Sequence, residues 1–229
     1  MNWIADNLDV IGELTLVHLQ QSVLAVVIGF VLSIPLGWVA WRYQLVRSGV
    51  ITITGLLYTI PSLAMLILLP SATGWYSIIS PANLIVALTI YAIAILVRSV
   101  ADGLDSVDDG VRQASTALGY GSFRRFWAVE LPLAGPVILA GLRVTVASTI
   151  ALATVGILVG ITNLGYLFTN GLQRRIIPEV LAGVVAVVVL AIVVDLLLVL
   201  LGRAVMPWTR RALPDRAARP RPAPIGADA

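Results

Sequence analysis

Five long apolar stretches dominate this sequence and decide what it can fold into. They cover residues 22–41, 49–70, 81–97, 133–161 and 180–202. A bilayer's hydrocarbon core requires about 20 apolar residues in a helix, whose backbone groups pair internally. With 59% hydrophobic and only 12% charged residues, the chain lacks the polar surface of a soluble domain. The sequence therefore predicts an all-α integral membrane protein with about five transmembrane helices.

The distribution of arginine predicts the orientation. All fifteen basic residues are arginine, and twelve of them fall in the first loop, the third loop and the C-terminal tail. The opposite set of loops holds only Arg174 and Arg175. Because positive residues gather on the cytoplasmic side, we expect the N-terminus outside and the C-terminus in the cytoplasm of a multi-pass inner (plasma) membrane protein. The arginines are too dispersed to indicate a nucleic-acid partner.

The two ends of the chain differ from the span-containing part, residues 14–203. Residues 1–13 carry three acidic residues and lack the basic start of a secretory signal. We interpret this segment as a short extracytoplasmic or interfacial helix. Residues 204–229 are rich in proline, alanine and charge, which predicts a disordered cytoplasmic tail. That tail either stays solvated or contacts anionic membrane lipid.

Residues 98–132 form the one long connection between spans, on the predicted cytoplasmic side. Ser106 or Asp108 can cap a helix there, and Gly119 can end it. Aromatic residues and two arginines follow. A short helix of small residues beside aromatics suits docking into a groove on another protein, whereas an amphipathic helix resting on lipid headgroups is the alternative.

The same connection carries a recognisable motif. Gln113, Ala114 and Ser115 are followed after three residues by Gly119, and nine residues later by Val129-Glu130-Leu131-Pro132. This stretch resembles the Glu-Ala-Ala loop of binding-protein-dependent ABC importer permeases. Gln113 stands where that family usually has Glu, and Val129 where it usually has Ile. The resemblance implies a type I importer fold similar to the methionine permeases, with 98–132 as the loop that contacts the ATPase.

A narrower resemblance concerns the transported solute. Residues 58–64 (YTIPSLA) and 130–143 look like the branch that imports glycine betaine, carnitine, choline or proline. It implies cytoplasmic ATP-binding subunits, a second copy or a related permease, and an extracytoplasmic solute-binding protein as partners. It also implies no cofactor in this chain, because ATP and Mg would bind the partner ATPase. Few aromatics cluster in the spans, so we expect the binding protein to select the solute.

A few residues inside the spans stand out. Arg143 and Asp195 are the only charges well within them, and both lie about 10–15 Å from a predicted cytoplasmic end. They could pair, either at a gate or as a structural pair. Pro61 and Ser62 interrupt the second span and are a candidate kink in the pathway, or a packing kink. His18 is interpreted as an interfacial histidine, and residues 160–175 as a re-entrant turn or a plain connector.

The sequence holds no catalytic set. It has one histidine, no cysteine and no phosphate-binding Gly-x-x-x-x-Gly-Lys-Ser/Thr loop, so neither zinc hydrolysis nor ATP hydrolysis by this chain is expected. A permease for another small solute such as methionine or phosphonate remains open. A stand-alone secondary transporter and a membrane assembly factor remain open as well.

Overall fold

The computed structural model describes residues 2–74 and 77–211, which contain helices and no strand. The short N-terminal α1 (Asn2–Asp6) precedes the long α2 (Leu8–Arg42). The remaining elements are α3 (Gln44–Thr59), α4 (Ser62–Thr73), α5 (Pro81–Asp105), α6 (Asp109–Ala117), α7 (Ser122–Arg125), the π-helical η1 (Phe126–Glu130), α8 (Leu131–Ala153), the 3-10 segment η2 (Thr154–Val159), α9 (Gly165–Gln173), α10 (Ile177–Val205) and the 3-10 segment η3 (Pro207–Arg211).

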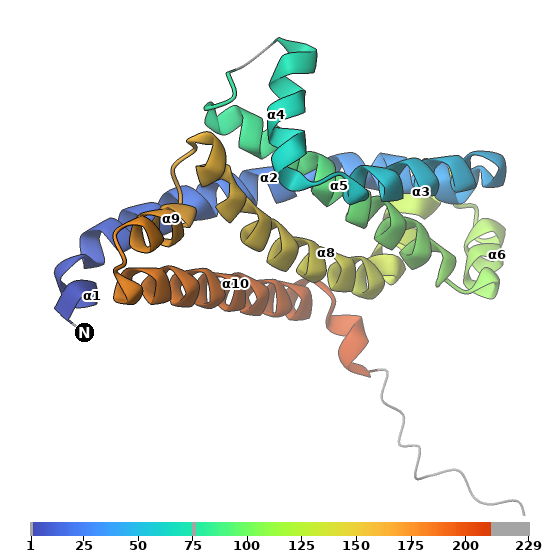
Figure 1. Ribbon diagram of the computed structural model, residues 1–229. Helices are drawn as coiled ribbons and strands as arrows, with labels where there is room; N and C mark the ends of the chain where they lie inside the picture. The colour runs from blue at the N-terminus through green and yellow to red at the C-terminus, as the bar shows by residue number, and fades with distance from the viewer. Residues whose placement is uncertain (1, 75–76, 212–229) are drawn as a thin grey trace, which may run out of the picture.

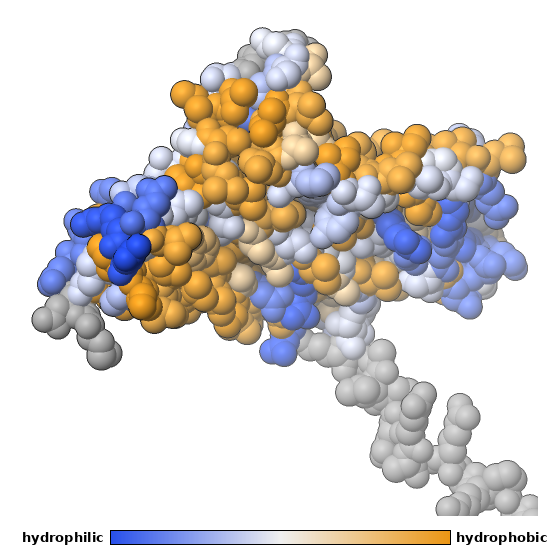
Figure 2. Space-filling view, viewed as in Figure 1, coloured by the Kyte–Doolittle hydropathy of each residue, from blue (hydrophilic) through white to orange (hydrophobic). Residues whose placement is uncertain are grey.

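The long helices α2, α5, α8 and α10 run along the length of the molecule (Figure 1). Helix α6 lies at one end, whereas α1 and α9 lie at the other. Figure 2 shows hydrophilic groups at two opposite ends and a mostly apolar surface between them, with one further hydrophilic cluster at its lower edge. In the described residues four helical segments are long and apolar enough to cross a membrane, or five if α3 and α4 form one broken span. The predicted all-α membrane fold with about five spans is confirmed.

Helix α5 is the centre of the bundle. It packs against α2, α3, α4 and α8, and its residues Leu96, Val97 and Val100 are fully buried. Small residues let its backbone come close to α2: a Cβ placed on Gly29 would lie 2.6 Å from the Cβ of Ala92. Such close approach provides the van der Waals contact that holds helices together in lipid.

The helices are longer than the predicted spans. Residues 8–13, assigned to a separate N-terminal segment, belong to α2, which continues without a break to Arg42. The prediction separated them because it followed hydropathy, whereas no proline stands between Leu8 and the span and the helix accommodates Gly12. Helix α10 likewise exceeds the predicted 180–202 at both ends. The predicted disordered tail starts too early, since 204–205 belong to α10 and η3 forms 207–211; residues 212–229 lie outside the described part of the chain.

The predicted second span, 49–70, is two helices rather than one kinked helix. Helices α3 and α4 meet at 106° across Ile60 and Pro61, and α4 projects from the body of the molecule (Figure 1). The break has a local cause, because Pro61 has no N–H to donate to the preceding turn and disfavours helical geometry at Ile60. Ile60 accordingly has extended backbone angles, with ψ at 126°.

The connection predicted as a loop at 98–132 is mostly helical. Helix α5 continues to Asp105, and residues from Ser122 onward already belong to the α7–η1–α8 segment. Within the connection 98–132, only residues 106–108 and 118–121 are non-helical, and these two stretches flank α6. The helical segment that contains the fourth predicted span, 133–161, therefore starts eleven residues earlier, at Ser122, and ends with η2. Residues 160–175 contain a short helix, α9, between two turns.

Candidate functional site

Helix α6 is capped at both ends by its own sequence. The Asp108 carboxylate accepts hydrogen bonds from the backbone N–H groups of Gly110, at 2.8 Å, and Val111, at 3.3 Å. At the other end Gly119 adopts a φ of +84°, and the N–H groups of Gly119 and Tyr120 bond back to Thr116 and Ser115. This is the glycine-ended turn that the sequence predicted. A helix of nine residues is too short to be stable alone in water, so these caps and its packing define it.

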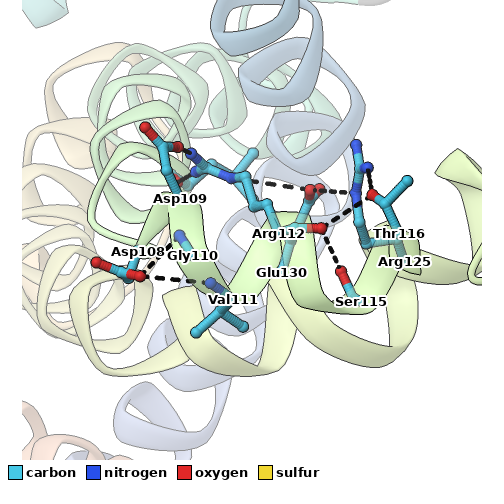
Figure 3. A network of polar contacts seen from close by, with 10 residues as sticks. Asp108, Asp109, Gly110, Val111, Arg112, Ser115, Thr116, Arg125 and Glu130 are labelled. Carbon is cyan, nitrogen blue, oxygen red and sulfur yellow. Dashed lines mark hydrogen bonds and ion pairs between the residues drawn. The ribbon is translucent and has the colours of Figure 1, made fainter. Parts of the chain in front are cut away.

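A buried carboxylate fixes α6 to the main bundle (Figure 3). Glu130, in η1, is 1% exposed and accepts a hydrogen bond from Nε of Arg125 at 2.8 Å. The same guanidinium donates to the hydroxyl of Thr116 on α6 at 2.9 Å. Nε of Arg112, on α6, lies 3.9 Å from the Glu130 carboxylate. The carboxylate and two arginines thus link α6, α7 and η1.

Arg112 connects this network to the spans. Its guanidinium donates to the carbonyl of Leu104 near the end of α5 and stacks over the ring of Trp41 on α2, 5.0 Å from the ring centre. Nearby, Arg47 at the start of α3 pairs with Asp105 of α5 at 2.5 Å. Arg112 therefore ties α6 to the ends of α2 and α5.

The structure separates the motif residues into three places. Gln113, Ala114 and Gly119 are exposed, and a Cβ on Gly119 would meet no atom within 4 Å in the part of the chain that the structure describes. Ser115 is buried and its hydroxyl donates to the carbonyl of Arg112 at 2.8 Å. Leu131 and Pro132 are half-buried in the first turn of α8. Leu118, a large apolar side chain at the C-terminal end of α6, is 79% exposed, and Phe123 in α7, whose ring contacts Trp127, is 80% exposed.

Sequence reasoning missed the role of Glu130 and its two arginines. Glu130 was recognised only as part of the motif. An acidic residue at the entrance of an apolar helix, five residues after Arg125, was a usable signal of an ion pair. A buried carboxylate needs a partner, and Arg125 was the nearest cation along the chain. The pairing with Arg112 had no such signal, because it depends on α6 folding back against η1.

Arg143 on α8 and Asp195 on α10 lie together. Nε and Nη2 of Arg143 donate to the two carboxylate oxygens of Asp195 at 2.6 and 2.7 Å. This two-pronged geometry is the strong form of an arginine–carboxylate pair. The pair is only partly covered, with side chains 44% and 32% exposed. It thus joins two helices on a face that the described residues leave open.

His18 was interpreted as an interfacial histidine, and the structure places its side chain inside the protein. Its side chain is fully buried, and Nε2 donates to the carbonyl of Ile150 at 2.9 Å. The neighbouring Gln21 bonds to Asn163, whose amide also donates to the carbonyl of Ala153 and accepts from the N–H of Gly165. This neutral cluster ties α2 to the turn between η2 and α9. The sequence could not reveal its link to α2, because His18 and Gln21 are 132 and 142 positions away from their partners.

Comparisons with known proteins agree with this architecture. The chain is 33% identical to the osmoprotectant import permease protein OsmW of Salmonella typhimurium, over 86% of its own length and 93% of that protein. It is 32% identical to the choline transport system permease protein OpuBB of Bacillus subtilis, over 86% and 90% of the two chains. It is 31% identical to the glycine betaine/carnitine/choline permease OpuCD of the same organism, over 85% and 83%.

A solved structure shows the same fold. An inward-facing structure of the MetNI methionine ABC transporter matches 82% of this chain and 93% of its own, with a TM-score of 0.74 and 22% identity. The family model of binding-protein-dependent transport system inner membrane components matches residues 17–211. This chain therefore belongs to the family of inner membrane components of binding-protein-dependent transport systems.

Proposed function

We propose that this chain is the transmembrane subunit of an ATP-driven importer for compatible solutes of the glycine betaine, carnitine, choline or proline type. The observation that carries the proposal is its similarity, over more than four fifths of its length, to several permeases that are named for such solutes. The likeness to the methionine transporter supports the fold alone, because the identity there is 22%.

Helix α6 is the proposed contact with the ATPase. Its outer face presents small and polar groups at Gln113 and Ala114, and the exposed Leu118 and Gly119 follow at its C-terminal end. An exposed apolar side chain at the end of a helix of small residues suits a groove on a soluble partner. Gln113 would offer hydrogen bonds where its relatives' usual Glu would offer a charge.

The other partners follow from the family's mode of action. Two cytoplasmic subunits would bind ATP and Mg, and this chain would hydrolyse nothing. A second permease, identical or related, would complete the pathway, and an extracytoplasmic binding protein would deliver the solute. Closure of the ATPases would move α6, and the Arg112–Glu130–Arg125 network would pass that movement to the spans.

Reconstitution in lipid vesicles tests the function. The permease, its ATPase and its binding protein should together accumulate labelled glycine betaine on addition of ATP, and omission of the ATPase should abolish uptake. Labelled methionine serves as the control solute and should not accumulate. Uptake driven by an ion gradient without the ATPase would instead show a secondary transporter.

The orientation has its own test. A reporter fused after Arg125 should be cytoplasmic, and one placed between Ser71 and Asn83 should be outside the cell. The reverse pattern would exclude contact between α6 and a cytoplasmic ATPase.

A further inference from the structure

The break between α3 and α4 lies near the middle of the membrane-crossing bundle. The hydroxyl of Tyr91 donates to the carbonyl of Ile60, at the break, with a distance of 2.6 Å. Tyr91 is in the 25-residue α5, ten residues after Pro81, or about 15 Å along that helix. Discontinuous helices at this depth are a recurrent way of exposing backbone groups to a transported solute.

The broken end of α3 presents backbone carbonyls. Ile60 N–H bonds to the carbonyl of Leu57, and Tyr91 satisfies the carbonyl of Ile60. The carbonyls of Tyr58 and Thr59 accept no hydrogen bond from any residue that the structure describes. Carbonyls at the C-terminal end of a helix carry partial negative charge and favour a cation nearby.

These carbonyls cannot be left facing lipid. Unsatisfied backbone groups in the hydrocarbon region are tolerated only against protein or along a water-filled cavity. Thr59 and Pro61 are both exposed in the isolated chain. The break must therefore be covered by another subunit or lie along the pathway.

An aromatic ring stands beside the carbonyls. Tyr58, in the last turn of α3, is 46% exposed, and its ring makes a T-shaped contact with Tyr91 at 5.9 Å between centres. Helices α3 and α4 contain no acidic residue, so these two helices place no full negative charge beside the carbonyls. A ring face and carbonyl dipoles without a carboxylate suit a quaternary ammonium group, which has no N–H to donate.

We propose that Tyr58 and the free carbonyls at the end of α3 form a transient binding site for the quaternary ammonium group of the solute during passage. This site rests on the proposed function and specifies which part of the solute the permease contacts. One exposed ring gives a weak attraction, so the solute is guided and not trapped. Selection by the binding protein is unaffected by such a site.

Transport by three variants tests the site in the reconstituted importer with saturating binding protein. Tyr58→Ala should lower ATP-dependent uptake of glycine betaine by roughly threefold to thirtyfold, the range expected for one cation–aromatic contact. Tyr58→Phe should keep most of the uptake because it keeps the ring. Leu56→Ala, at an exposed apolar position of the same helix, is the matched control and should resemble the wild type. Retention of the ATPase on purification verifies that each variant folds.

Labelling provides a measurement independent of transport. The chain contains no cysteine, so Thr59→Cys introduces a single thiol at the break. A trimethylammonium methanethiosulfonate should label it several times faster than a sulfonate analogue of similar size. Adding Tyr58→Ala should reduce that preference.

The outcomes are distinguishable. Wild-type uptake in Tyr58→Ala, an equal loss in Tyr58→Phe, or a Thr59→Cys thiol inaccessible to both reagents would overturn the site and leave the proposed function standing. If the wild type accumulates no quaternary ammonium solute, the proposed function fails and this site fails with it.

Discussion

The two ends of the bundle are held together by different chemistry. At the α6 end, charged groups dominate: Glu130 binds Arg125 and approaches Arg112, and Arg47 pairs with Asp105. At the opposite end, neutral amides and an imidazole bond to one another and to backbone carbonyls, through Asn163, Gln21 and His18. A buried polar network with satisfied partners rigidifies the elements that it joins, so the charged network holds α6 to the spans and the amide network holds the turn before α9 to α2. Under the proposed function, the contact that moves with the ATPase is at the α6 end, whose charged network would carry the movement to the spans.

The largest expected effect comes from removing the carboxylate at the centre of the charged end. Glu130→Ala removes the acidic partner of Arg125 and the more buried of two acidic partners of Arg112, and breaking a buried pair costs about 3–5 kcal/mol in soluble proteins. Thermal unfolding of the purified importer should show a clear loss of stability and weaker retention of the ATPase. Asp109→Asn, which alters an 81% exposed partner of Arg112, is the control and should change little. Equal effects from both would contradict a central role for Glu130.

The neutral end should respond more moderately. Asn163→Ala removes hydrogen bonds to Gln21, Ala153 and Gly165, and leaving buried partners unsatisfied costs about 1–3 kcal/mol. We expect a lower unfolding temperature with the ATPase still bound, because α6 is untouched. Loss of ATPase binding in this variant would remove the distinction between the two ends.

The Arg143–Asp195 pair, away from α6, tests whether a charge pair elsewhere in the bundle stabilises the protein as the Glu130 network does. Arg143→Gln or Asp195→Asn alone should lower stability, because each leaves one charge on an apolar face, and the double variant should recover part of the loss. Unfolding temperatures of the two single variants and the double variant measure the coupling. Strictly additive losses would show that the bidentate contact contributes nothing.

Sequence reasoning reached local features and missed those that depend on distant contacts. Hydropathy revealed the spans, and local turn chemistry revealed the caps of α6, because Asp108 and Gly119 act within a few residues. Equal depth from one membrane face was enough to suggest that Arg143 and Asp195 meet. The right-angle break was underestimated, because a proline in an apolar run indicates an interruption but not its angle. Burial of His18 and the partners of Glu130 depend on helix packing, which a single sequence does not display.

The central claim is that α6 transmits ATPase movement, and Gly119 offers its most direct test. A Cβ at Gly119 meets no atom within 4 Å among the described residues, so a larger side chain there is expected to clash with a docked partner. Its positive φ also costs a side-chain-bearing residue about 1 kcal/mol. Gly74 shares both properties at the end of α4, with φ at +66° and open space around a Cβ, and is the matched control. The measurement is recovery of the ATPase with Gly119→Val and with Gly74→Val, alongside solute-stimulated ATP hydrolysis. The account predicts that Gly119→Val loses both while Gly74→Val keeps both; full recovery and stimulation with Gly119→Val would contradict it.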